Sequence, residues 1–109
     1  MANKLHALQS TLRDGPNPLC IDLFDGSAEG QLRSSNSVYL RRIPSEDAEA
    51  LALLVKDLAG LDASAPPRAQ SGTFRLENEQ FTVNCCPQFN GEILVVHRSE
   101  AALNVLPRR

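Results

Sequence analysis

The chain of 109 residues contains no tryptophan, one tyrosine and one methionine. It also has no apolar run long enough to cross a membrane. The net charge of −2 is slightly acidic and provides no basic surface of the kind that binds nucleic acid or anionic lipid. Its first residues lead into a mixed segment without the apolar core of a signal peptide. We therefore expect a cytoplasmic protein without membrane insertion and without nucleic acid as a partner.

Cysteine is scarce, and the spacing of the three cysteines does not match a metal-binding motif. Cys20, Cys85 and Cys86 are odd in number and form no CxxC pair, which argues against a disulfide framework or a zinc site. Adjacent cysteines in a strand point to opposite faces. Cys85 and Cys86 are either a strained redox pair, or one core residue and one incidental thiol. Cysteine's usual role as a small buried residue favours the second interpretation.

Catalytic motifs are missing as well. The sequence has no GxxxxGK[ST] phosphate loop, no GxGxxG fingerprint and no GxSxG elbow. His6 and His97 stand far from any partner of a triad, and the carboxylates fall in turns and at helix ends, where solvation explains them. We expect a protein that is not an enzyme and that uses no cofactor and no metal.

Two helices are predicted by apolar spacing. Leu5, Leu8 and Leu12 form a stripe that packs on the domain or on a partner, and Gly15 with Pro16 ends this helix. A longer helix is predicted from 45 to 61, with Ser45 as its cap and acidic residues in its first turn. Its core stripe comprises Leu51, Leu54, Val55, Leu58 and Leu61. Ser99 is expected to cap a last short helix.

Strands are predicted by alternation over 19–24, 29–33 and 38–43, and three more lie between Gln70 and Arg98. The segment 93–96 is almost entirely apolar, which predicts a central strand covered on both faces. The fold class is thus α+β, a single domain spanning 1–109. A mostly antiparallel sheet of about five or six strands carries one long helix, with short helices at 1–15 and 99–109 around a core at 19–98.

Exposed positions on this scaffold are candidate partner contacts. Arg41 and Arg42 point to opposite faces of one strand, so solvated edge charges are favoured over phosphate binding. Phe89 lies in the turn 87–92, where its ring either contacts a partner or packs on the sheet edge, and packing is favoured. Leu5, Leu8 and Leu12 of the first helix are the remaining candidate partner contacts.

An ordered set of motifs runs through the second half of the chain. Residues 55–62, VKDLAGLD, fit a helix end that reads IKxLAxLDI. Gln70-x-Gly72 fits part of a following PQDG motif, and Pro87 with Gly91-Glu92 fits a final PTxxGE motif. With these motifs, residues 19–98 resemble the domain that precedes the nucleotide-binding domain in type II secretion and type IV pilus assembly ATPases, the GspE and PilB group.

The resemblance implies that arginines of this domain reach the phosphates of ATP held by the neighbouring catalytic domain. In this chain those positions are occupied by Thr73, Thr82 and His97. Threonine carries no charge and cannot make the bidentate contact that a phosphate needs. Other arginines lie near these positions but out of register: Arg68, Arg75 and Arg98. The scaffold motifs are kept and the ATP-facing residues are absent.

Two functions are compatible with the sequence. The first is a noncatalytic protein-binding or regulatory component of a bacterial secretion or type IV pilus system. The alternative is a type III secretion chaperone, which is also acidic, of similar length and built of helices flanking an antiparallel sheet. Such a chaperone would be a homodimer, with Leu5, Leu8 and Leu12 in an effector-binding or dimer helix. Both alternatives imply a protein partner.

Overall fold

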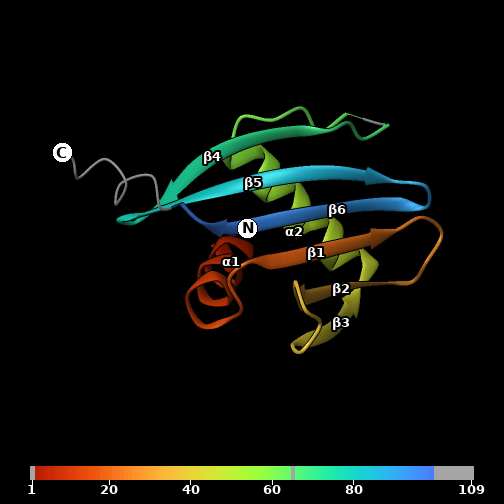
Figure 1. Ribbon diagram of the computed structural model, residues 1–109, viewed down its shortest axis with the longest axis horizontal. Helices are drawn as coiled ribbons and strands as arrows, with labels where there is room; N and C mark the ends of the chain where they lie inside the picture. The colour runs from red at the N-terminus through yellow and green to blue at the C-terminus, as the bar shows by residue number, and fades with distance from the viewer. Residues whose placement is uncertain (1, 65, 100–109) are drawn as a thin grey trace.

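The computed structural model describes residues 2–64 and 66–99, and within these ranges it contains two helices and one six-stranded sheet. In chain order the elements are α1 (Ala2–Asp14), β1 (Leu19–Phe24), β2 (Glu29–Ser34), β3 (Leu40–Pro44), α2 (Ser45–Leu58), β4 (Gln70–Leu76), β5 (Glu79–Gln88) and β6 (Gly91–Arg98). The strands lie in the order β3-β2-β1-β6-β5-β4, and every neighbouring pair is antiparallel (Figure 1). The predicted α+β class and antiparallel sheet are therefore confirmed.

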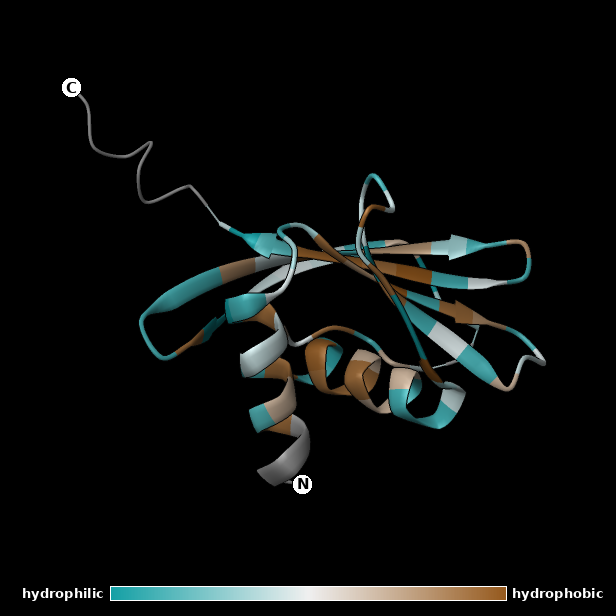
Figure 2. Cartoon of the chain, turned by 90° about the horizontal axis from the view of Figure 1, so that it is seen from below, coloured by the Kyte–Doolittle hydropathy of each residue, from teal (hydrophilic) through white to brown (hydrophobic). Residues whose placement is uncertain are grey.

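Both helices lie on the same face of the sheet (Figure 2). Helix α2 crosses behind the strands and packs mainly on β1 and β2 (Figure 1). Its approach is close because small residues meet at the crossing. A Cβ added to Gly30 of β2 would lie 2.6 Å from the Cβ of Ala48. Ala48 and Ala52 are accordingly more buried than the leucines that predicted this helix.

The core lies between this helical layer and the inward face of the sheet. Each strand contributes alternate residues to it, as the period of two requires. Burying one such side chain stabilises the fold by about 1.5–3 kcal/mol before entropy costs are subtracted. The largest of the fully buried side chains are Leu8, Leu19, Ile21, Val55, Val83, Leu94 and Val96.

Helix α1 is fixed to this core through two of its three leucines. Leu8 is 0% exposed and Leu12 is 4% exposed, whereas Leu5 is 36% exposed. At the C-terminal end of α1, Nη2 of Arg98 donates a hydrogen bond of 3.2 Å to the carbonyl oxygen of Leu12. A cation at this end also suits the helix dipole. The stripe thus packs on the domain, and only Leu5 remains open to a partner.

The bounds of α2 differ from the prediction at both ends. Pro44 is the N-cap residue and no side chain, including that of Ser45, caps the helix. The helix ends at Leu58 instead of residue 61, because Gly60 turns the chain at a φ of 69°. The backbone N–H groups of Gly60 and Leu61 donate back to Asp57 and Lys56, which is a Schellman ending.

The turn between β2 and β3 is longer than its sequence suggests. Asn36 Oδ1 accepts hydrogen bonds from the hydroxyl of Ser34 and the backbone N–H of Val38, which stabilises the turn locally. Val38 is consequently 85% exposed, and β3 starts at Leu40. At the opposite end of the sheet, β5 continues through Pro87, so the turn before β6 is short.

The second face of the sheet is not covered by any element among the described residues (Figure 2). We call it the uncovered face. Strand β6 is central, as predicted, but it is buried on one face only. Leu94 and Val96 lie under the helices, while Ile93 and Val95 are only partly buried on the uncovered face. The expectation of a strand covered on both faces was wrong, because both helices pack on the same side. The predicted helix after Ser99 lies outside the described residues.

Candidate functional site

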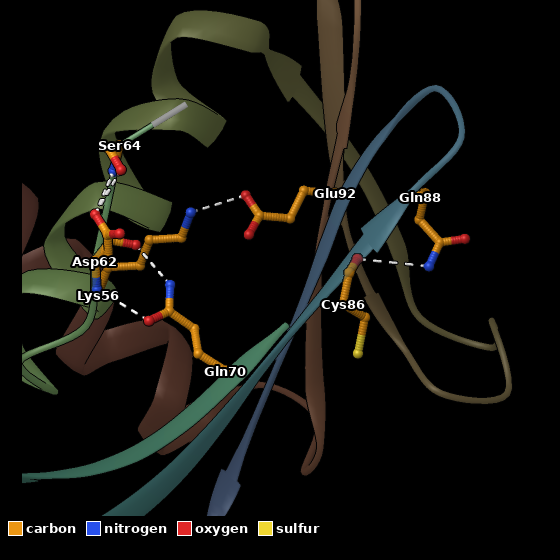
Figure 3. Close-up of polar contacts among 7 residues, drawn as sticks. All are labelled: Lys56, Asp62, Ser64, Gln70, Cys86, Gln88 and Glu92. Atoms are coloured by element: carbon orange, nitrogen blue, oxygen red, sulfur yellow. Dashed lines mark hydrogen bonds and ion pairs between the residues drawn. The ribbon is translucent and has the colours of Figure 1, made fainter. Parts of the chain in front are cut away.

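The motifs that carry the family resemblance meet in one place. Lys56 lies near the end of α2, Asp62 in the following loop, Gln70 at the start of β4 and Glu92 at the start of β6 (Figure 3). These residues are separated by up to 36 positions in the chain, yet each contacts another member of the set. The contacts tie Asp62, in the loop after α2, to β4 and tie α2 to β6, so these four residues have a structural role.

Asp62 and Gln70 clamp the two ends of this loop. The backbone N–H of Asp62 donates to Oε1 of Gln70 at 3.0 Å, and Nε2 of Gln70 donates to the carbonyl oxygen of Asp62 at 2.6 Å. The Asp62 carboxylate accepts hydrogen bonds from the backbone N–H and the hydroxyl of Ser64, at 2.9 and 2.7 Å. These bonds favour the ionised form and hold the pKa of Asp62 below its ordinary value.

Lys56 and Glu92 form a buried ion pair beneath the sheet. Nζ of Lys56 lies 2.9 Å from Oε1 of Glu92, and each side chain is 6% exposed (Figure 3). The second carboxylate oxygen, Oε2, is also buried and has no hydrogen-bond partner among the described residues. Such a pair is a weak source of net stability, since both ions lose their hydration, but losing one partner is costly. The pair therefore makes the position of α2 sensitive to either residue.

A groove opens beside this ion pair, which we call the Glu92 groove. It consists of two adjoining hollows of about 350 and 290 Å³ that share Leu23, Glu49, Pro67 and Glu92 in their linings. The first hollow runs between α2 and the loop 62–68, and the second reaches the turn between β1 and β2. The remaining lining residues are Phe24, Asp25, Gly26, Ser27, Ala52, Leu53, Lys56, Ala63, Ser64 and Gly91.

Thr73, Thr82 and His97, which the sequence resemblance sets against arginines of the ATPases, lie on the uncovered face. Thr73 pairs with Thr82, and Thr82 pairs with His97, so the three residues form one row across β4, β5 and β6. Paired residues of antiparallel strands project from the same face. Arg75, which is out of register by two residues from Thr73, projects from this face as well. Arg98 does project from the opposite face, where it stacks on Phe81.

Beside this row the uncovered face is partly apolar and partly ionic. Phe24, Ile93 and Val95 supply its apolar centre, and Phe24 is 37% exposed. Nε of Arg33 lies 2.6 Å from Oδ2 of Asp22, and this hydrogen bond raises the pKa of Arg33. Asp22 is buried despite its place on the uncovered face, because β1 lies between β2 and β6.

The exposed positions proposed from the sequence are dispersed. Leu5 is on α1, Arg41 and Arg42 are exposed on the edge strand β3, and Phe89 is at the tip of the β5–β6 turn. Phe89 is completely exposed, so the favoured expectation that it packs on the sheet edge was wrong. The register places Arg41 and Arg42 on opposite faces, as predicted. No hydrogen bond or ion pair between described residues joins these positions into one site.

The three cysteines are unpaired, and adjacent Cys85 and Cys86 project from opposite faces as expected. Burial raises the pKa of the Cys20 and Cys85 thiols, which makes them poor nucleophiles, while Cys86 is half-buried. Within residues 2–64 and 66–99, no group of three histidine, cysteine or carboxylate side chains is arranged to hold a metal ion. Neither helix in the described part of the chain has the length and apolar character needed to cross a bilayer.

The sequence indicated parts of these sites and missed others. Its motifs contain Lys56, Asp62, Gln70 and Glu92 but did not single out these four residues. The one sign of a buried lysine was the place of Lys56 beside the apolar stripe of α2, and nothing indicated Glu92 as its partner. Comparison with known proteins adds no identity, because no protein-family model and no curated protein matches the chain.

Proposed function

We propose that the protein is a noncatalytic protein-binding component of a bacterial secretion or type IV pilus system, working in the cytoplasm. The observation that carries the proposal is the uncovered face of the sheet. Its centre is apolar at Phe24, Ile93 and Val95, and neutral polar residues flank this centre at Thr73 and Thr82. Partly exposed apolar surface of this kind is stabilised when another protein covers it.

The row of Thr73, Thr82 and His97 supports protein as the partner. A phosphate would be held by arginines or lysines, which supply charge and paired donors. Two threonines and one histidine provide little of either, so this row is poorly suited to nucleotide. It is instead similar to the polar rim that surrounds the apolar centre of many protein interfaces.

The contacts among Lys56, Asp62, Gln70 and Glu92 support the link to secretion systems. Residues that a chain shares with its family are expected to have a common physical role. Here they fasten one loop and one helix to the sheet. Thr73, Thr82 and His97, where the chain departs from the family's arginines, lie on the uncovered face and take no part in these contacts.

Capture of partners from the native cell, followed by mass spectrometry, tests this proposal. We expect the chain to recover a component of a secretion or pilus system. Thr73→Glu introduces a charge on the uncovered face at an exposed position and should reduce this recovery. Ser10→Glu, at an exposed position of α1, is the control and should retain it. Recovery of no such component, under conditions that preserve other secretion complexes, would contradict the proposal.

The chaperone alternative is favoured by the same face, since two copies can bury it against each other. In that case the chain is a dimer, and Thr73→Glu weakens the dimer while Ser10→Glu does not. Light scattering at high protein concentration distinguishes the two proposals. A monomer would argue against the chaperone.

A further inference from the structure

The Glu92 groove combines charge, an apolar wall and an unsatisfied acceptor. Glu92 pairs with Lys56 through Oε1 only, and Oε2 is buried without a partner among the described residues. A buried carboxylate oxygen without a donor is costly, so a ligand that supplies one relieves that cost. The groove therefore favours a hydrogen-bond donor.

The charges that line the groove favour a cationic donor. Lys56 is neutralised by Glu92, while Glu49 and Asp25 form no ion pair with any described residue. The lining thus carries one positive and three negative side chains, a net charge of −2 from +1 and −3. Low-dielectric walls concentrate such a field and attract a ligand of opposite sign.

The walls of the groove suit a long aliphatic stem. Leu23, Ala52, Leu53 and Pro67 line it, and Leu53 is 52% exposed although it is a large apolar residue. Lysine and arginine both cover apolar surface with their methylene groups while keeping the charged head on polar partners. Arginine differs in having five donors in a rigid plane, which lets one head group serve two carboxylates.

We infer that the Glu92 groove receives an arginine side chain from a protein partner. The guanidinium pairs with Glu49 in the groove, and a rotation of the Glu92 carboxylate, whose Oε2 is buried in the unliganded chain, lets it donate to that oxygen as well. Its methylene stem lies against Leu53 and Pro67. This inference rests on the proposed protein-binding function and adds the residue type that the partner must present. The groove opens on the helical side of the sheet, and Phe24 is the lining residue that it shares with the uncovered face.

A pair of short peptides tests the inference directly. The ¹⁵N-labelled chain is titrated with acetyl-Ala-Leu-Arg-Leu-Ala-amide, and with the same peptide carrying citrulline in place of arginine. Citrulline has nearly the same shape as arginine but no charge. We expect the arginine peptide to shift the backbone amide signals of Ala63, Ser64 and Glu92, and the citrulline peptide to leave them unchanged. Equal shifts from both peptides, or none from either, would overturn the inference.

Variants of helix α2 provide the matched control. Glu49→Gln should weaken binding of the arginine peptide about 2- to 5-fold, the value of a solvent-exposed ion pair. Glu46→Gln, on the same helix but outside the lining of the groove, should leave it unchanged. Equal effects of the two variants would contradict a site at Glu49. A response to putrescine as strong as the response to the peptide would also overturn the assignment to a protein side chain.

The capture experiment separates this inference from the proposed function. If Glu49→Gln recovers the secretion component as well as the unchanged chain does, the groove is not the contact and the function stands. If no secretion component is recovered while the arginine peptide still binds at Ser64 and Glu92, the secretion role fails and the groove remains an arginine site.

Discussion

The buried ion pair between Lys56 and Glu92 gives the sharpest test of how this fold is held together. Lys56→Met removes the positive charge and keeps most of the volume, leaving the Glu92 carboxylate in a site where its side chain is 6% exposed. Breaking such a pair costs about 3–5 kcal/mol. That is a large part of the roughly 5–15 kcal/mol expected for the whole domain.

The double substitution Lys56→Met with Glu92→Leu has a different expected result. Both desolvated charges are then absent, and apolar groups of similar size fill the space. Such replacements are often neutral or stabilise the fold by about 1–4 kcal/mol. We therefore expect the double variant to recover all or nearly all the stability lost in the single variant. The effects of the two substitutions on the free energy of unfolding are then strongly non-additive.

Urea unfolding followed by far-ultraviolet circular dichroism measures these differences, since the chain has no tryptophan to serve as a fluorescent probe. With a slope of about 1.5 kcal/mol per molar urea, the midpoint of Lys56→Met should fall by roughly 2–3 M. Arg13→Met is the control, because Arg13 and Glu77 form an exposed pair at 3.4 Å with side chains 57% and 64% exposed. It should cost less than about 1 kcal/mol. A loss below about 1 kcal/mol for Lys56→Met would refute the argument that the pair is desolvated.

Two further predictions concern groups whose pKa values the fold shifts. In the native protein, Cys86 should react with Ellman's reagent, while Cys20 and Cys85 react only on unfolding, because burial excludes the reagent and raises their pKa; rapid labelling of two thiols would contradict this. Ser64→Ala removes one of the two hydrogen bonds to Asp62, so the pKa of Asp62 should rise toward its ordinary value in an NMR titration. Because the folded pKa is depressed, this carboxylate stabilises the fold above its unfolded pKa, and the contribution is lost as the pH falls through the folded pKa. An unchanged pKa in the variant would show that the hydroxyl bond is unimportant.

The local structure of this protein follows closely from its sequence. Alternation at 19–24 predicted β1 at its observed bounds, and the three strands predicted between Gln70 and Arg98 are β4, β5 and β6. The long helix was predicted from its leucines. These features depend on the periods of 2.0 and 3.6 residues, which the backbone imposes on any sequence.

The sequence by itself determined the strands, the helices and the set of motif residues, whereas tertiary structure decided which of them meet. Ala48 of α2 packs directly on β2 because Gly30 has no side chain at the point of contact. Lys56 is buried because Glu92 approaches from 36 residues away. Burial and ion pairing depend on contacts between distant segments. These contacts form only when β1 pairs with β6 and joins the two halves of the sheet.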